Sequence, residues 1–365
     1  MRVSRQRVSA TAGLLAVIAL TVLAALVACG GGGFDPASKV DSVRLFVVKA
    51  DKPYAKPGDT VNLEALLTDA RRERPRVAKL YWIPILCLNP QDDLYFLCFA
   101  NPGDAGNQAG ATRLIPVGSF ADAGATGAGA AGGNPFSAIP TGVDLAPFLP
   151  QGPTFSFRMP DDAIQPRARD PEHPYGLVVV FNVLCAGRLE FVARDPEGAA
   201  QQVPIACSDD NGVRLPASDY VIGITRVYSF PDRINTNPVL EKVTFEGNDV
   251  DLAKGITFEK CTAEKEKDCK ENKIDVRVSD SSWETNPSDV TRDGELREQI
   301  WVDYYSDIGT FDDEARLLFD TRVGRVSESE VKFRAPKSVA DGTMWAVVHD
   351  NRGGAAWYVV PFHVR

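Results

Sequence analysis

Alternation of hydrophobic and polar residues with a period of two dominates the first part of the chain. An apolar run at 43–48 is followed by a Lys-Pro-Gly-Asp turn at 56–59 and by alternating apolar residues at 61–67. A further run at 78–83 contains Trp82, which we expect to be a core aromatic residue. Such patterns are typical of half-buried β-strands separated by tight turns.

More strand patterns follow before residue 230, at 154–160, 175–185 and 220–228, and the second of these is the most apolar. Together with the earlier runs they predict a first antiparallel β-sandwich at 39–230. A Gly-, Ala- and Pro-rich insert at 101–142 interrupts it and is too poor in large apolar groups to form a packed core. A phosphate cradle is the alternative for a Gly-rich loop, but the Gly-Lys-Ser or Gly-Lys-Thr signature is missing.

A linker with Pro at both ends, 231–238, leads to a second predicted antiparallel sandwich at 239–365. Its strands are expected at 240–245, 255–259, 273–278, 299–305, 316–319, 330–334, 343–349 and 356–364. The charged segment between Cys261 and Cys269 is interpreted as a hairpin tip. The predicted fold class is therefore all-β, with two antiparallel β-sandwich domains in tandem.

The order of elements in the first domain resembles that of immunoglobulin-like domains. A strand, a Pro-Gly-Asp turn, an alternating strand and then a strand carrying Trp82 form the opening half of such domains. The resemblance implies an immunoglobulin-like sandwich in which this Trp packs between two sheets, with Tyr175 in a contact similar to a tyrosine corner. It also predicts that the disulfides lie elsewhere than in that family, because the B-like strand at 61–67 contains no Cys.

Residues 1–28 have the layout of a secretory leader, with a basic start and an apolar stretch that ends in small residues. The junction Leu26-Val27-Ala28-Cys29 resembles the lipobox of bacterial lipoproteins, which implies that the leader is removed and that Cys29 carries the lipid. Residues 29–38 would then be the lipidated Cys and a Gly-rich tether. An uncleaved transmembrane anchor is the alternative, since 18 or more apolar residues can span a bilayer.

The residue after Cys29 indicates which membrane holds the anchor. In Gram-negative lipoproteins an Asp at this position resembles an inner-membrane retention signal, whereas this chain has Gly30 there. We therefore expect a lipid-anchored protein of the outer membrane that faces the periplasm or the cell surface.

Six of the seven cysteines remain when Cys29 is set aside. They form pairs that are close in sequence: Cys87 with Cys98, Cys185 with Cys207, and Cys261 with Cys269. Six cysteines allow 15 connectivities, and sequential disulfides are the simplest assignment in an oxidising compartment. A metal site is the alternative, but the Cys-x-x-Cys spacing and neighbouring His that it would need are missing.

Composition narrows the function further. The net charge of −9, from 40 basic and 49 acidic residues, disfavours nucleic-acid binding, which needs a basic surface. The three histidines, His173, His349 and His363, lie in turn or strand contexts, and the sequence contains neither a Gly-x-Ser-x-Gly nor a His-Glu-x-x-His motif. We therefore predict a non-enzymatic protein without a cofactor or a bound metal.

Two features remain as candidate binding sites. Acidic clusters near residues 249–251, 289–295 and 312–314 offer oxygen ligands for calcium, but the Asp-x-Asp-x-Asp-Gly loop is missing, and solvated turns are the alternative. In the strand at 301–305, alternation places Trp301 and Tyr305 on one face, which we take as a candidate ligand face. Ordinary sandwich packing is the alternative for these aromatic residues.

The chain as a whole resembles predicted envelope lipoproteins of the myxobacterial kind. The resemblance rests on the lipobox, the segment 180–187, the Asn-Thr-Asn-Pro sequence at 235–238 and the segment 345–354. It implies localisation and fold but no activity. The predicted function is a membrane-anchored, non-enzymatic structural or protein-binding subunit with an envelope protein as partner, and the alternative is a surface polysaccharide-binding or adhesive module.

Overall fold

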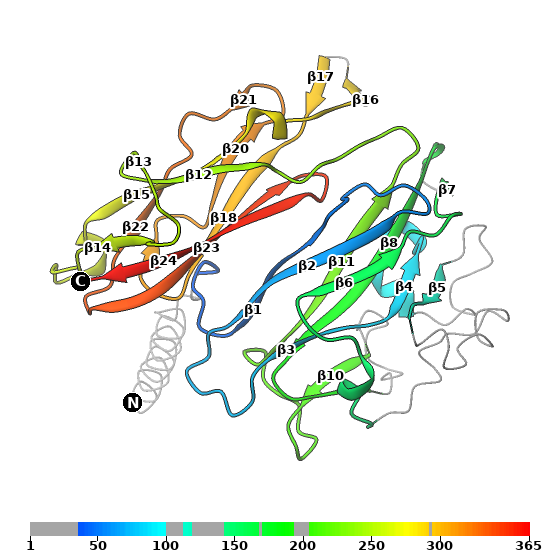
Figure 1. Cartoon of the computed structure of the whole chain (residues 1–365), viewed down its shortest axis with the longest axis horizontal. Helices are drawn as coiled ribbons and strands as arrows, with labels where there is room; N and C mark the ends of the chain where they lie inside the picture. The colour runs from blue at the N-terminus through cyan, green and yellow to red at the C-terminus, as the bar shows by residue number, and fades with distance from the viewer. Residues whose placement is uncertain (1–35, 100–111, 119–141, 168–169, 193–203, 292–293) are drawn as a thin grey trace, which may run out of the picture. The chain divides into compact units, whose positions relative to one another are not determined.

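The computed structural model describes residues 36–99, 112–118, 142–167, 170–192, 204–291 and 294–365. Ser38–Arg365 form one compact unit. The described residues form β-strands and short 3-10 turns, without an α-helix, so the all-β prediction is confirmed (Figure 1). Cys29 and most of the 101–142 insert lie outside the described residues.

The first half of the chain builds its own antiparallel sheets. Its strands are β1 (Val43–Ala50), β2 (Thr60–Asp69), β3 (Lys79–Trp82), β4 (Ile85–Leu88), β5 (Arg113–Pro116), β6 (Thr154–Arg158), β7 (Gln165–Arg167), β8 (Asp170–Cys185), β9 (Arg188–Phe191), β10 (Ile205–Ser208) and β11 (Tyr220–Ser229). One sheet has the order β1-β2-β6 and the other β11-β8-β4-β5, while β3 also pairs with β8 (Figure 1). β3 and β4 are one strand broken at Pro84, which has no N–H to donate.

This order is that of an immunoglobulin-like sandwich, in which the first, second and fifth strands share one sheet and the remaining strands form the other. Trp82 lies in the third strand position and is fully buried, as predicted. Its indole N–H donates to the Gly152 carbonyl at 2.9 Å, and its ring stacks on Phe155 at 5.3 Å. Tyr175 lies in β8, but its hydroxyl donates to a carboxylate oxygen of Asp93 at 2.5 Å rather than to the backbone contact of a tyrosine corner.

The central strand β8 is buried on both of its faces from Gly176 to Cys185. Val178, Val180 and Leu184 pack into the core between the two sheets, and Val179 and Phe181 pack into a second core on the outer face of their sheet. That outer core contains Cys87, Cys98, Cys185 and Cys207, which form the disulfides Cys87–Cys98 and Cys185–Cys207. Because neither face meets water, the strand is continuously apolar instead of alternating.

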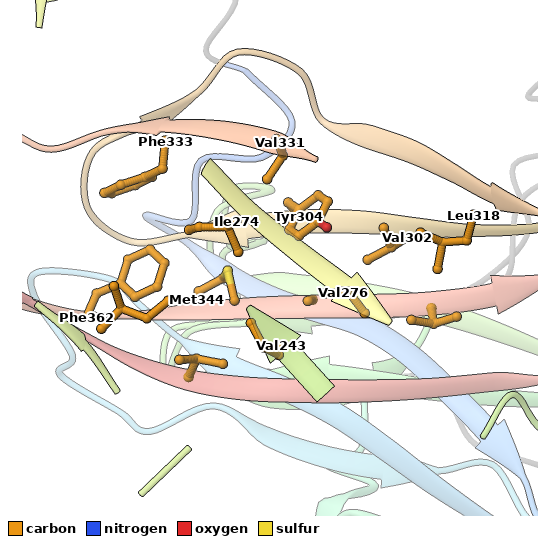
Figure 2. Packing of buried hydrophobic residues seen from close by; sticks show 14 of the residues in the cluster. Val243, Ile274, Val276, Val302, Tyr304, Leu318, Val331, Phe333, Met344 and Phe362 are labelled. Carbon is orange, nitrogen blue, oxygen red and sulfur yellow. The ribbon is translucent and has the colours of Figure 1, made fainter. Parts of the chain in front are cut away.

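The second half repeats the arrangement. Its strands are β12 (Leu240–Phe245), β13 (Asn248–Asp249), β14 (Ile256–Phe258), β15 (Glu271–Val278), β16 (Thr285–Thr291), β17 (Gly294–Arg297), β18 (Ile300–Ser306), β19 (Thr310–Phe311), β20 (Ala315–Asp320), β21 (Gly324–Arg325), β22 (Val331–Arg334), β23 (Ala340–Asp350) and β24 (Ala355–Val364). One sheet has the order β13-β12-β15-β22-β19 and the other β14-β24-β23-β18-β20-β21. Side chains from both sheets interdigitate in one core, which includes Tyr304, Phe333 and Phe362 (Figure 2).

The Cys261–Cys269 disulfide is confirmed, but the interpretation of its loop as a hairpin tip is wrong. β14 pairs in parallel with β24, whereas β15 pairs with β12 and β22. The loop between β14 and β15 therefore crosses from one sheet to the other, and the disulfide closes this crossover.

Candidate interaction groove

The two aromatic residues predicted as a ligand face lie where alternation places them. Val302 and Tyr304 are fully buried in the core, and Trp301 and Tyr305 project from the opposite face of β18. The Tyr305 ring lies 5.0 Å from the ring of Phe46, a residue of β1, and burial raises the pKa of Tyr305 to about 12. Part of this face is therefore covered by the chain itself. Trp301 stacks on His349 at 5.3 Å, and its role in ligand binding stays a prediction.

β1 is held on both faces, which explains why its sequence does not alternate. Leu45 and Val48 pack against the core of the first sandwich. Phe46 and Val47 pack against a cluster that contains Trp345 and Val347 of β23, and the Phe46 ring stacks on Trp345 at 5.0 Å. The strand thus connects the two halves of the unit through apolar contacts.

A groove of about 600 Å³ lies beside this strand. Two of its walls are Leu45–Val48 of β1 and Val221–Arg226 of β11, and the third is the turn His349–Ala355 between β23 and β24. The aromatic residues Tyr54, Tyr228 and Phe230 lie at one end. Its wall combines aliphatic and aromatic side chains from the strands with polar groups that come mainly from the turn. Concave sites where apolar side chains and convergent polar groups meet are typical of binding sites.

Two strand edges open into this groove. β1 is the last strand of its sheet and pairs only with β2, and β11 is the last strand of the other sheet and pairs only with β8. In the described part of the chain, no named strand pairs with the other edge of either, and the edge of β11 is occupied only at Tyr228, whose carbonyl accepts from the Ala55 N–H at 2.9 Å. β1 flanks β11 closely without pairing with it: a Cβ on Gly223 would lie 2.6 Å from Cδ2 of Leu45 and 2.2 Å from Oδ1 of Asn182.

The aromatic end of the groove is formed by rings that pack on one another. Phe230 lies 4.7 Å from Tyr54 and 5.9 Å from Tyr228, and Tyr175 stacks on Phe230 at 5.6 Å from outside the groove. Burial is the main cause that raises the pKa of Tyr228. These rings close one end of the groove and do not form a row of flat faces.

Arg226 is the exposed cation of the groove. Its guanidinium lies 6.0 Å from the ring of Tyr95, and no carboxylate among the described residues forms an ion pair with it. The guanidinium of Arg352 is buried and donates to Oε1 of Glu298 at 3.0 Å, and His349 lies 3.3 Å from Asp303. One positive side chain is thus presented to solvent at a groove in an acidic protein.

The turn that forms the third wall rests on two buried carboxylates. Oδ1 of Asp350 accepts hydrogen bonds from the N–H groups of Arg352 and Gly354, each at 2.8 Å. Burial is the main cause that raises the pKa of Asp350. Glu298 is fully buried, and burial, reinforced by the charge of Asp350, raises its pKa to about 8.

Two linker residues connect to the same turn. Asn235 donates to Asp350 at 3.3 Å, and Asn237 accepts from the N–H of Ala355 at 2.9 Å and donates to the Ala50 carbonyl at 2.8 Å. The Asn-Thr-Asn-Pro sequence and the segment 345–354, which are more than 100 residues apart, therefore meet in one polar network. This network positions the turn beside the edge of the first sandwich.

The acidic clusters considered for calcium are engaged with cations where the structure describes them. Asp249 pairs with Lys242 at 2.8 Å, and Asp312 pairs with Arg316 at 2.9 Å. No group of three or more His, Cys, Asp or Glu side chains that could hold a metal ion occurs among the described residues. The side chains of the 289–295 cluster lie outside the described part of the chain.

Comparisons with known proteins give no family. No protein-family model matches the sequence, and no curated protein matches it. Among solved structures, the chain is similar to latent PorU from Porphyromonas gingivalis at 11% identity and a TM-score of 0.18, over 89% of this chain and 24% of that one. It is similar to red sea bream transglutaminase at 11% identity and a TM-score of 0.22, over 90% and 32%.

A third similarity is to the FN1–FN3 domains of chicken CNTN1, at 9% identity and a TM-score of 0.18, over 90% of this chain and 65% of that one. The chain thus spans less than two thirds of the length of each of these structures, and at these TM-scores none carries an argument about function. The strand order alone establishes the immunoglobulin-like fold, and the fold by itself does not assign a function. Within the described residues, no helix is long and apolar enough to cross a membrane.

Sequence reasoning did not find the groove. Its walls come from strands that are far apart in the chain, β1 and β11, and from the turn after β23. One local signal was present: Arg226 is a charged residue within the otherwise apolar strand Tyr220–Ser229. A cation in such a strand indicates a position that faces solvent. Only the structure shows that β11 is an edge strand, and the two facts together place Arg226 at the groove.

Proposed function

We propose that the protein is an exported lipoprotein, anchored through Cys29, that binds a protein partner in the cell envelope without catalysing a reaction. The predicted leader and the lipobox resemblance support the anchor. The three disulfides support an oxidising compartment. The Gly-rich tether at 29–38 would give the sandwiches reach from the membrane surface.

The groove carries the protein-binding part of this proposal. Its wall combines two strand edges, β1 and β11, with half-buried aliphatic side chains such as Val47, Ile222 and Ile224. Open strand edges beside apolar surface are templates for pairing with another polypeptide. A polysaccharide site would be better supported by exposed rings in a row, whereas Tyr305 is covered by Phe46 and the rings at the groove end pack on one another.

Replacement of the lipid-bearing residue tests the anchor. We expect the wild-type protein to incorporate a palmitate analogue and Cys29→Ser to lose the label, because Cys29 is the proposed site of acylation. Cys261→Ser together with Cys269→Ser is the control, since it removes two cysteines that form a disulfide and leaves the lipobox unchanged. Membrane association of the wild-type protein without label incorporation would support the uncleaved transmembrane anchor instead.

Crosslinking in intact cells tests the function. The protein is captured through a C-terminal tag after crosslinking, and the captured material is quantified by mass spectrometry and by sugar analysis. We expect a single protein at near-equal abundance. Capture of cell-wall or capsular sugar without such a protein would contradict the proposal and favour the polysaccharide-binding module.

A further inference from the structure

We propose that the groove binds an extended segment of the partner as an added strand on the free edge of β11, with two apolar side chains beside Ile222 and Ile224 and an acidic side chain beside Arg226. This inference rests on the proposed function and specifies the chemistry of the partner. Strand addition obtains affinity from backbone hydrogen bonds and specificity from alternate side chains.

The alternation along β11 defines which partner residues meet which wall. Ile222 and Ile224 pack with the outer core of their sheet, and Arg226 has the same parity and reaches toward Tyr95 on that side. Val221 has the opposite parity and packs with the core between the sheets. Side chains of an added strand on the outer side would therefore neighbour Ile222, Ile224 and Arg226 at every second position.

The other side of the groove restricts the remaining positions of the partner. Gly223 is covered by Leu45, because a Cβ there would lie only 2.6 Å from the Leu45 methyl group. Partner residues that point toward β1 therefore meet a closely packed wall and should be small. The segment from Ile222 to Arg226 spans about 13 Å in a strand, so about five partner residues pair along it.

The acidic residue follows from the charges at the groove. Arg226 is exposed, whereas the side chains of Arg352 and Glu298 are 7% and 0% exposed and bind each other. Asp350 is buried and accepts backbone hydrogen bonds within its own turn. An added strand with a carboxylate opposite Arg226 gains an attractive cross-strand pair, and a strand with a cation there is repelled.

Peptide binding to the full chain, purified in detergent, tests the inference. The probes are Thr-Glu-Thr-Val-Thr-Val-Thr and its reversed sequence, which place Glu opposite Arg226 in an antiparallel and in a parallel added strand. In matched peptides Lys replaces Glu. We expect one Glu peptide to bind about tenfold more tightly than its Lys counterpart, measured by fluorescence anisotropy. We also expect hydrogen exchange to slow at Ile222, Ile224 and Arg226, because these alternate amides point away from β8, on the side where the Tyr228 carbonyl accepts from Ala55.

Charge reversal provides the matched variants. Arg226→Glu should reverse the preference, so that the Lys peptide binds more tightly. Arg158→Glu is the control, because Arg158 is an exposed residue on β6, the edge strand at the opposite end of its sheet from β1, and it should leave both affinities unchanged. Circular dichroism shows whether both variants fold.

Three results would overturn the inference: no binding of either Glu peptide at about 1 mM, equal effects of the two Arg→Glu variants, or binding that protects amides outside β11. In each case a single protein captured by crosslinking in cells would still support the proposed function. Failure of that crosslinking would reject the proposed function independently of the peptide result.

Discussion

The buried carboxylate of Glu298 gives a pH dependence whose sign the structure determines. Glu298 lies beneath the turn that lines the groove, accepts a hydrogen bond from Arg352 at 3.0 Å through Oε1, and has no partner at Oε2 among the described residues. Burial is the main cause that raises its pKa from 4.5 to about 8, and the charge of Asp350 adds to it. Its neutral form is therefore favoured in the folded protein up to about pH 8.

The sign follows from proton linkage. Between pH 4.5 and about 8 the folded state binds the Glu298 proton more tightly than the unfolded state, so the free energy of unfolding decreases as the pH rises. The limiting slope for one group is about 1.4 kcal/mol per pH unit. The loss continues up to the folded pKa and is complete above it.

Urea unfolding measures this effect at pH values of about 5.5, 6.5, 7.5 and 8.5, which cover the range in which Glu298 titrates in the folded protein. We expect the wild-type protein to lose about 1 kcal/mol per pH unit, and Glu298→Gln, which mimics the neutral acid, to show a much flatter profile. Glu271→Gln is the control, because Lys332 and Arg334 lower the pKa of Glu271 and it titrates below this range. A wild-type slope in Glu298→Gln, with lower stability at pH 8.5, would show instead that Glu298 is an ionised partner of Arg352.

Three substitutions test the packing around the groove, each by urea unfolding at constant pH. Gly223→Ala should destabilise by about 1–3 kcal/mol, because the new methyl group meets Oδ1 of Asn182 first and Cδ2 of Leu45 at 2.6 Å, and an unchanged midpoint would contradict this close approach. Phe46→Ala should cost about 2 kcal/mol through loss of a half-buried side chain and two ring contacts, whereas a change below about 0.5 kcal/mol would show that the halves do not depend on it. Removing the Cys185–Cys207 disulfide by a double Ser substitution should lower the free energy of unfolding by about 3 kcal/mol for a sequence separation of 22. Equal stability of reduced and oxidised wild-type protein would show that the disulfide does not stabilise the fold.

Much of the fold could be predicted because its signals are local. The alternation at 61–67 and the apolar run at 175–185 both fall within strands, and the short separations of the cysteines favoured the pairs that form. Alternation also placed Trp301 and Tyr305 on one face of β18, opposite Val302.

The errors and omissions share one physical origin, which is pairing between distant segments. The strand at 256–258 was recognised, but its parallel partner is at 362–364, so the Cys261–Cys269 loop was misread as a hairpin tip. The covering of Tyr305 by Phe46 could not be predicted for the same reason, since the two residues belong to different halves of the chain. Periodicity shows which face of a strand is apolar but does not identify the surface that covers it.

Site-specific photocrosslinking in intact cells tests the central claim, that this protein binds a protein partner through the open edge of β11. A photoreactive residue is placed at Ile222 in the groove, which leaves Arg226 intact, or, as the control, at Arg158 on edge strand β6. The account predicts one discrete crosslinked protein from position 222 and none from position 158. Equal crosslinking from both positions, or no crosslinked protein from position 222, would contradict it.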